Sequence, residues 1–129
     1  MKILHVVGAR PNFMKVAPVW RAIYKMTDFD QLLIHTGQHY DDRMSNVFFK
    51  ELDIPSPEYN LNIRSGSHAN QTAEIMISFE KVCNKINPDL VIVVGDVNST
   101  MACSIVAKKL QIKLAHIEAG LRSNDKNMP

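Results

Sequence analysis

The sequence has few cysteines and no long apolar run. Cys83 and Cys103 are its only two cysteines. They do not form a CxxC pair, and both lie in apolar helical contexts, so we expect two buried, reduced thiols. The first apolar run, Ile3–Val7, is too short for a signal peptide and lacks a cleavage pattern. No run approaches the ~20 apolar residues that a membrane helix needs. These absences predict a cytoplasmic protein.

The chain also lacks a strong excess of one charge. It has 15 basic and 13 acidic residues and a formal net charge of +2. This balance predicts no strong electrostatic attraction to nucleic acid or to an anionic membrane. Its 129 residues, 46% of them apolar, are sufficient for one domain with a core of its own.

Apolar runs alternate with stretches of helical periodicity along the whole chain. Helices are predicted after Pro11, over Asp42–Leu52, from Ser67 or Asn70 to Asn87, and after Asp96. Strands are predicted at Ile3–Val7, Asp30–Thr36, Leu90–Val94 and the run ending at Ile117, with a weak one in Glu58–Ile63. This alternation predicts an α/β fold with a parallel sheet and helices on both faces.

Some local signals modify this pattern. Pro18 lies inside the first predicted helix and should kink it or split it in two. Arg64–Ala69 is a polar stretch without an apolar anchor and is predicted to be a mobile loop. The polar tail Ser123–Pro129 is typical of a loop that continues, so we expect the chain to be the front part of a longer protein.

Two predicted strands end in a carboxylate. Asp96 follows Leu90–Val94, and Glu118 follows the next strand along the chain. Neighbouring parallel strands lie about 4.8 Å apart, so these groups can share a site suited to acid–base chemistry. A second interpretation is that the two carboxylates are unrelated surface groups, with Asp96 or Asn98 serving as a helix N-cap.

The first predicted strand leads into Gly8-Ala9-Arg10-Pro11-Asn12. A GxGxxG loop needs three glycines and this turn has one, so a nicotinamide or flavin dinucleotide site is disfavoured. A helix N-terminus with Arg10 and Lys15 beside it suits a phosphate or a sugar diphosphate. The alternative is that both cations are solvated surface charges.

The five histidines, His5, His35, His39, His68 and His116, form no HExxH motif and no Cys/His cluster. We therefore expect no metal site. His39 and His116 are better interpreted as polar groups near the carboxyl-terminal edge of the sheet. There is no GxSxG elbow and no P-loop.

Four strings then become specific in their order and spacing: GARPNFMK, HTGQHYDDRM, GDVNST and HIEAGLRS. Together they resemble the non-hydrolysing UDP-N-acetylglucosamine 2-epimerases, over essentially all of residues 1–129. The resemblance implies a glycosyltransferase-B architecture, in which two Rossmann-like domains enclose the active site. Residues 1–129 would be part of the N-terminal domain, without the C-terminal nucleotide-binding domain.

The resemblance also implies an activity. Such enzymes interconvert UDP-GlcNAc and UDP-ManNAc by eliminating UDP and adding it back after C2 is protonated on the opposite face. The implied partner is a UDP-sugar, with no cofactor, in a homodimer of the full-length protein. Residues 1–129 alone are expected to bind UDP-sugar weakly and not to turn over. With a sheet edge or a helix face left exposed, they are also expected to self-associate or to be less stable.

The matched motifs assign roles to individual residues. The implied catalytic residues are Asp96 and Glu118; the implied substrate-binding residues are Arg10, Lys15, His39, Asn98 and Arg122; and Gln38 and His39 match a regulatory region. The sequence departs from the family at four positions, Ala9, Asn12, Asp41 and Ser67. The last two fall in the region where many bacterial members bind an activating UDP-GlcNAc.

Three other functions stay open from sequence. A glycosyltransferase of the same architecture would move the sugar to an acceptor. A hydrolysing epimerase would release free ManNAc. A flavodoxin-like binding module would bind no UDP-sugar and would be a complete fold at this length.

Overall fold

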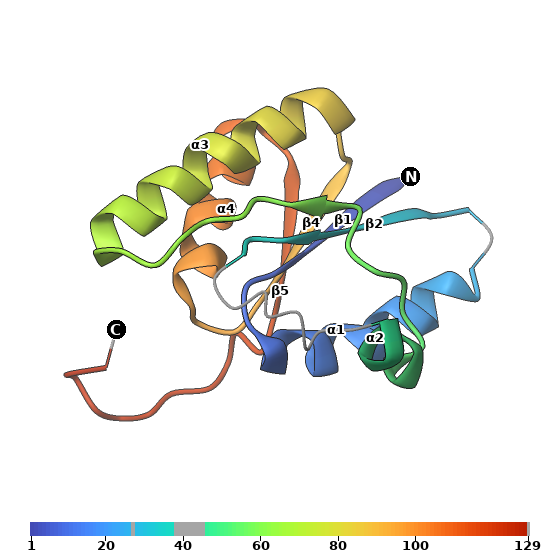
Figure 1. The fold of residues 1–129 in the computed structure, drawn as a ribbon, viewed down its shortest axis with the longest axis horizontal. Coiled ribbons are helices and arrows are strands. Elements are labelled where there is room, and N and C mark those ends of the chain that lie inside the picture. The colour runs from blue at the N-terminus through green and yellow to red at the C-terminus, as the bar shows by residue number, and fades with distance from the viewer. Residues whose placement is uncertain (27, 38–45, 129) are drawn as a thin grey trace.

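A parallel sheet forms the centre of the molecule (Figure 1). The computed structural model describes residues 1–26, 28–37 and 46–128. Its five strands lie in the order β3-β2-β1-β4-β5, and every neighbouring pair is parallel. The strands are β1 (Lys2–Val7), β2 (Asp30–His35), β3 (Tyr59–Asn60), β4 (Leu90–Val94) and β5 (Lys113–Ile117), and the helices are α1 (Arg10–Tyr24), α2 (Asn46–Leu52), α3 (His68–Ile86) and α4 (Asn98–Lys109).

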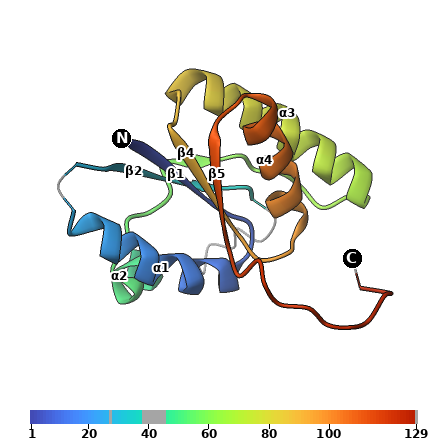
Figure 2. The ribbon, with the colours of Figure 1, turned by 180° about the vertical axis from the view of Figure 1, so that it is seen from behind.

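Helices cover both faces of the sheet, as the alternating pattern predicted. Figure 2 shows α1 and α2 on one side of the strands and α3 and α4 on the other. One buried cluster joins the sheet to α3 and α4 and includes Leu4, Phe79 and Val106. The other joins it to α1 and α2 and includes Phe13 and Trp20. The near-continuous apolar strands are explained by this burial on two faces.

The first helix is a single element from Arg10 to Tyr24, although Pro18 lies inside it. The predicted split into two helices is therefore wrong. Pro18 is exposed, so its ring lies on the solvent side of the helix and not against the sheet.

The boundaries of α3 follow local capping rules. The Ser67 hydroxyl accepts a hydrogen bond from the Asn70 N–H at 3.2 Å, which confirms one of the two predicted caps. Asn87 ends the helix in the left-handed region at φ 51°, as the Asn-Pro pair predicted. Because α3 begins at His68, the predicted loop Arg64–Ala69 is shorter than expected.

Other boundaries differ from the sequence pattern. The weak strand is the two-residue β3, paired with the end of β2. The predicted second helix begins before the described part of α2, at positions outside the described residues. None of the helices in the described ranges has the length and apolar character needed to cross a membrane.

Candidate functional site

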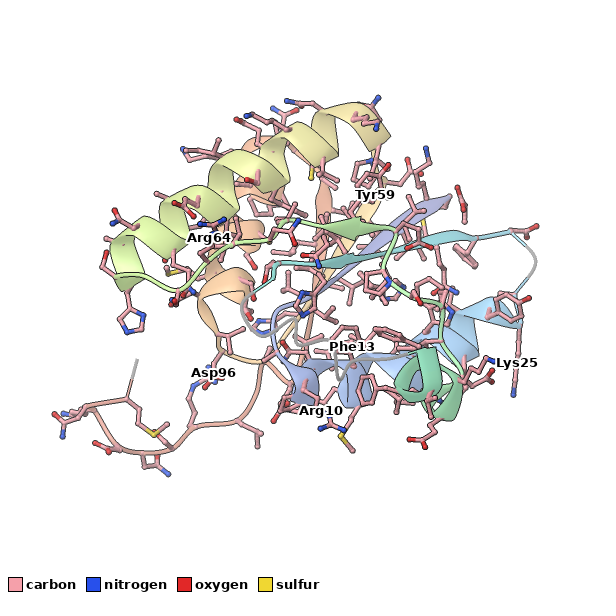
Figure 3. All side chains as sticks on the ribbon, viewed as in Figure 1. Arg10, Phe13, Lys25, Tyr59, Arg64 and Asp96 are labelled. Carbon is pink, nitrogen blue, oxygen red and sulfur yellow. The ribbon has the colours of Figure 1, made fainter. Side chains whose placement is uncertain are left out.

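The carboxyl-terminal ends of β4 and β5 carry the two carboxylates singled out by the sequence. Val94 pairs with Ile117 in the sheet, so Asp96 and Glu118 leave neighbouring strands at the same edge. Both line a pocket of about 880 Å³, together with His116 and Arg122. This is the edge at which ligands bind in open parallel sheets. Figure 3 shows Asp96 on this edge of the molecule.

Glu118 has an unusual backbone and a charged partner. Its φ is +64°, in the left-handed region that few residues other than glycine adopt. Its carboxylate forms an ion pair with the Lys15 ammonium, which comes from the second turn of α1. The structure thus brings Lys15 to the pocket's carboxylate from another element. The strained backbone and the ion pair together fix where this carboxylate lies.

The turn from β4 into α4 leaves its polar side chains uncommitted to capping. The N-cap is Val97, which makes no side-chain capping hydrogen bond. The interpretation of Asp96 or Asn98 as an N-cap is therefore wrong. Thr100 holds the turn from inside, since its buried hydroxyl donates to the Val94 carbonyl at 2.7 Å. Asp96 stays exposed at the mouth of the pocket.

The turn from β1 into α1 is closed by one side chain. The Asn12 Oδ1 atom accepts hydrogen bonds from the Gly8 and Ala9 N–H groups, each at 3.0 Å. These two N–H groups are therefore not free to bind a phosphate. A Cβ atom added to Gly8 would lie 2.1 Å from the Ser99 hydroxyl oxygen, so this turn packs directly on α4. From the sequence, Asn12 was noted only as a difference from the usual family residue, and this capping role was not predicted.

Arg10 is on the same edge but has a different contact. Its guanidinium lies 4.9 Å from the centre of the Phe48 ring, a cation–π distance. Phe48 in turn packs edge-on against Phe13. Figure 3 shows Arg10 and Phe13 at the start of α1. Arg10 is absent from the residues that line the pocket with Asp96 and Glu118.

Two further predicted residues make bonds to their own surroundings. Arg122 lines the pocket, and its Nη1 group donates to the carbonyls of Ala119 and Leu121 at 2.9 and 2.7 Å. His116 Nε2 donates to the Gly95 carbonyl at 2.6 Å, which ties the ends of β4 and β5 together. Gln38 and His39 lie outside the described residues.

Asn98 follows the pocket residue Asp96 by two positions, is not itself among the residues that line the pocket, and contacts α3 through its side chain. Its side-chain nitrogen lies 2.7 Å from Gln71 Oε1 and 3.0 Å from His68 Nδ1. Sequence reasoning did not assign a role to His68 or Gln71. The signal was weak because their three-residue spacing only places both on one helix face, and the partner is distant in sequence.

The cysteines and histidines fit no redox or metal chemistry in the described residues. Cys83 and Cys103 are free and buried, as predicted. Burial, with a smaller effect of Glu80, raises the pKa of the Cys83 thiol to about 12. Burial also raises the pKa of Cys103 well above its usual value. Over the residues that the structure describes, no group of three or more His, Cys, Asp or Glu could hold a metal ion.

Comparison with known proteins identifies the family. The sequence model described as UDP-N-acetylglucosamine 2-epimerase matches residues 21–129. The chain belongs to this family. A UDP-N-acetylglucosamine 2-epimerase homolog of Methanococcus maripaludis is 55% identical over 129 residues, which are 100% of this chain and 36% of that protein. A UDP-2,3-diacetamido-2,3-dideoxy-D-glucuronate 2-epimerase of Pseudomonas aeruginosa is 46% identical, over 100% of this chain and 36% of that protein.

A solved structure of the UDP-N-acetylglucosamine 2-epimerase family has the same fold. The Methanocaldococcus jannaschii UDP-GlcNAc 2-epimerase, crystallised with UDP-GlcNAc and UDP, matches with a TM-score of 0.91 and 50% identity. The match covers 100% of this chain and 35% of that one. The chain thus spans about a third of the length of the relatives it matches. The prediction of a Rossmann-like α/β fold, similar to the N-terminal third of glycosyltransferase-B-like epimerases, is confirmed.

Proposed function

We propose that the protein containing this chain interconverts UDP-GlcNAc and UDP-ManNAc by epimerisation at C2. The observation that carries the proposal is the placement of Asp96 and Glu118 on adjacent strand ends, lining one pocket. Family membership and the printed names of the relatives support the substrate class.

The chemistry explains why two acid–base groups are needed. Elimination removes the proton from C2, forms a C1=C2 double bond and breaks the bond from C1 to the UDP oxygen. The return step protonates C2 on the opposite face, and UDP adds at C1. Because the proton leaves one face and arrives at the other, one group on each side is required. Asp96 and Glu118 are our candidates for these two groups.

Basic residues at the same edge would assist the departure of UDP. Lys15 holds Glu118 through its ion pair and places a positive charge beside the pocket. Arg122 also lines the pocket, and Arg10 lies at the start of α1. Cations near a leaving diphosphate stabilise the charge that develops on it. The reaction neither oxidises nor reduces the sugar, so the proposal includes no cofactor.

The proposal extends to the setting of the protein. A second, nucleotide-binding domain would form the opposite wall of the site, since the chain matches about a third of each relative. We further propose a cytoplasmic homodimer. The free, buried cysteines support a reducing compartment. Exposed apolar side chains at Ile77, Met101 and Ile105 support a covered face on α3 and α4.

The test uses the full-length protein that contains this chain. Alternatively, it uses the M. jannaschii enzyme with its matching third replaced by this chain. UDP-GlcNAc is incubated in D₂O and followed by proton NMR. We expect UDP-ManNAc to appear with deuterium at C2 in both epimers, because the proton exchanges with solvent. Free ManNAc would instead indicate a hydrolysing epimerase, and transfer to an added acceptor would indicate a glycosyltransferase.

A second substrate has support from one relative. The P. aeruginosa protein, 46% identical to this chain, is named for a UDP-2,3-diacetamido-2,3-dideoxy-D-glucuronate substrate. That sugar adds an acetamido group at C3 and a carboxylate at C6 to the same C2 chemistry. Comparing kcat/KM for the two nucleotide sugars on the same protein decides between them. We expect UDP-GlcNAc to have the higher value, since the relative with the highest identity quoted above is named for it.

A further inference from the structure

A polar cluster joins α3 and α4 at the carboxyl-terminal edge of the sheet. It consists of His68 and Gln71 from the first turn of α3, and Asn98, the first residue of α4. Asn98 is half-buried, and its side-chain nitrogen contacts both partners, at 3.0 Å for His68 Nδ1 and 2.7 Å for Gln71 Oε1. Asn98 also follows Asp96 by two residues, so the cluster is directly connected to the turn that carries the proposed acid–base group.

The hydrogen-bonding capacity of Asn98 decides which of its atoms is left for a ligand. A side-chain amide has two N–H donors and one carbonyl acceptor. Gln71 Oε1 can only accept, and His68 Nδ1 accepts when the ring proton is on Nε2. These two partners take both donors. Within the described part of the chain, the Asn98 Oδ1 atom has no hydrogen-bond partner, so it remains as an acceptor.

We propose that His68 and Gln71 are positioning residues that hold Asn98 with its side-chain oxygen directed to the sugar nucleotide. Asn98 then accepts a hydrogen bond from a hydroxyl or an acetamido N–H of the ligand. This inference rests on the proposed function and adds a determinant of specificity to it: the site selects a ligand with a donor at this position. Without His68 and Gln71 the amide is free to rotate and to present its N–H₂ group instead.

The kinetic test measures UDP-GlcNAc epimerisation by the full-length protein that contains this chain. The variant His68→Phe keeps the ring shape but removes the acceptor, and we expect kcat/KM to fall about tenfold, mainly through KM. His68→Gln restores an acceptor oxygen and should lose less than His68→Phe. In the double variant with Asn98→Ala, adding His68→Phe should cause no further loss, because both act through the same contact. Independent, multiplying losses would overturn the proposal.

A matched control lies on the same helix. Asn84→Ala alters an exposed residue near the other end of α3, about 24 Å from His68 at 1.5 Å per residue. It should leave kcat/KM unchanged. Circular dichroism and thermal unfolding of every variant show whether a loss of activity reflects a loss of fold. A loss in Asn84→Ala as large as that in His68→Phe would contradict a specific positioning role.

Two further measurements do not depend on turnover. Long-range ¹H–¹⁵N NMR on this chain reports which ring nitrogen of His68 carries the proton. We expect Nε2, and a proton on Nδ1 would overturn the proposal. Calorimetry of UDP-GlcNAc binding should show weaker affinity in Asn98→Ala and His68→Phe. If the protein binds UDP-GlcNAc without epimerising it, the proposed function fails while these affinities still decide the role of the cluster. If it does not bind at all, both are wrong.

Discussion

The turns that follow β1 and β4, two neighbouring strands of the sheet, use their polar residues in opposite ways. At the end of β1, the Asn12 oxygen accepts both N–H groups of the Gly8-Ala9 turn. At the end of β4, the N-cap Val97 has no capping side chain, and Asp96 stays exposed at the pocket. Both are turns from a strand into a helix. The first uses a side chain to satisfy its own backbone, and the second leaves the Asp96 side chain exposed at the pocket.

The same contrast holds for histidines. His5 on β1 is fully buried, and its Nε2 lies 2.8 Å from Gln31 Oε1. His116 on β5 is exposed and lines the pocket. We therefore expect the β1 region to contribute mainly to stability and the β4–β5 edge mainly to the proposed reaction. Substitutions in the first region should change unfolding, and substitutions in the second should change turnover.

The largest expected effect is at the β4–β5 edge. Asp96→Asn and Glu118→Gln remove the proposed acid–base groups while keeping their shape. In the full-length protein that contains this chain, each substitution should lower kcat about a thousandfold with a modest change in KM. A loss of this size is within the range that general acid–base catalysis contributes. Thermal unfolding should change little. Glu51→Gln, at an exposed site on α2, is the control. Near-normal turnover in both variants would remove the catalytic assignment.

The next effect is at the β1 turn and concerns stability. Asn12→Ala leaves two backbone N–H groups without an acceptor, and one of these bonds is fully buried. We expect the free energy of unfolding to fall by about 2–4 kcal/mol, measured by urea denaturation. Asn12→Asp keeps the accepting oxygen and should fall by less than about 1 kcal/mol. Equal losses in the two variants would show that the accepting oxygen is not what stabilises the turn.

The buried histidine of β1 predicts a pH dependence. Burial lowers the pKa of His5 from 6.5 to about 4, against a smaller raising effect of the Gln31 bond. Below pH 6.5 the unfolded chain binds a proton that the folded protein does not. The free energy of unfolding therefore falls as the pH is lowered from about 6.5 to about 4. Between pH 7 and pH 5 this loss is about 2 kcal/mol. His5→Phe should flatten this part of the stability–pH curve. An unchanged slope would contradict the assignment.

How far the sequence predicts these regions depends on whether the signal is local. The strand Leu90–Val94 and the Asn87 stop follow from neighbouring residues and were predicted correctly. Ser67 was one of two predicted caps for α3, and it is the one that forms. The adjacency of Asp96 and Glu118 also followed, because consecutive strands of a parallel sheet end at the same edge. For Pro18 the sequence left two outcomes open, a kink or a split, and of these the single helix Arg10–Tyr24 excludes the split.

The contacts of the site were not predictable in the same way. The Lys15–Glu118 pair and the bonds from Asn98 to His68 and Gln71 join residues far apart in sequence. Their formation depends on how α1 and α3 pack on the sheet. Likewise, Arg10 was predicted to bind a diphosphate, and its stacking over Phe48 depends on where α2 lies. Motif resemblance identified residue types here, but only the fold shows which atoms meet.

The smallest effect tests whether the β4 turn really lacks a cap. Val97 has the extended backbone of an N-cap, at φ −81° and ψ 168°, so Val97→Thr adds a hydroxyl acceptor with almost no change of shape. We expect the free energy of unfolding to rise by about 0.5–1 kcal/mol in urea denaturation, because the first turn gains a side-chain acceptor for its N–H groups. Val97→Ala, which removes volume without adding a cap, should lower it. A loss in Val97→Thr as well would mean that burial of the valine methyl outweighs capping. A gain with unchanged turnover would show that the first turn of α4 can be capped at Val97 without involving Asp96, whose side chain stays available to the ligand.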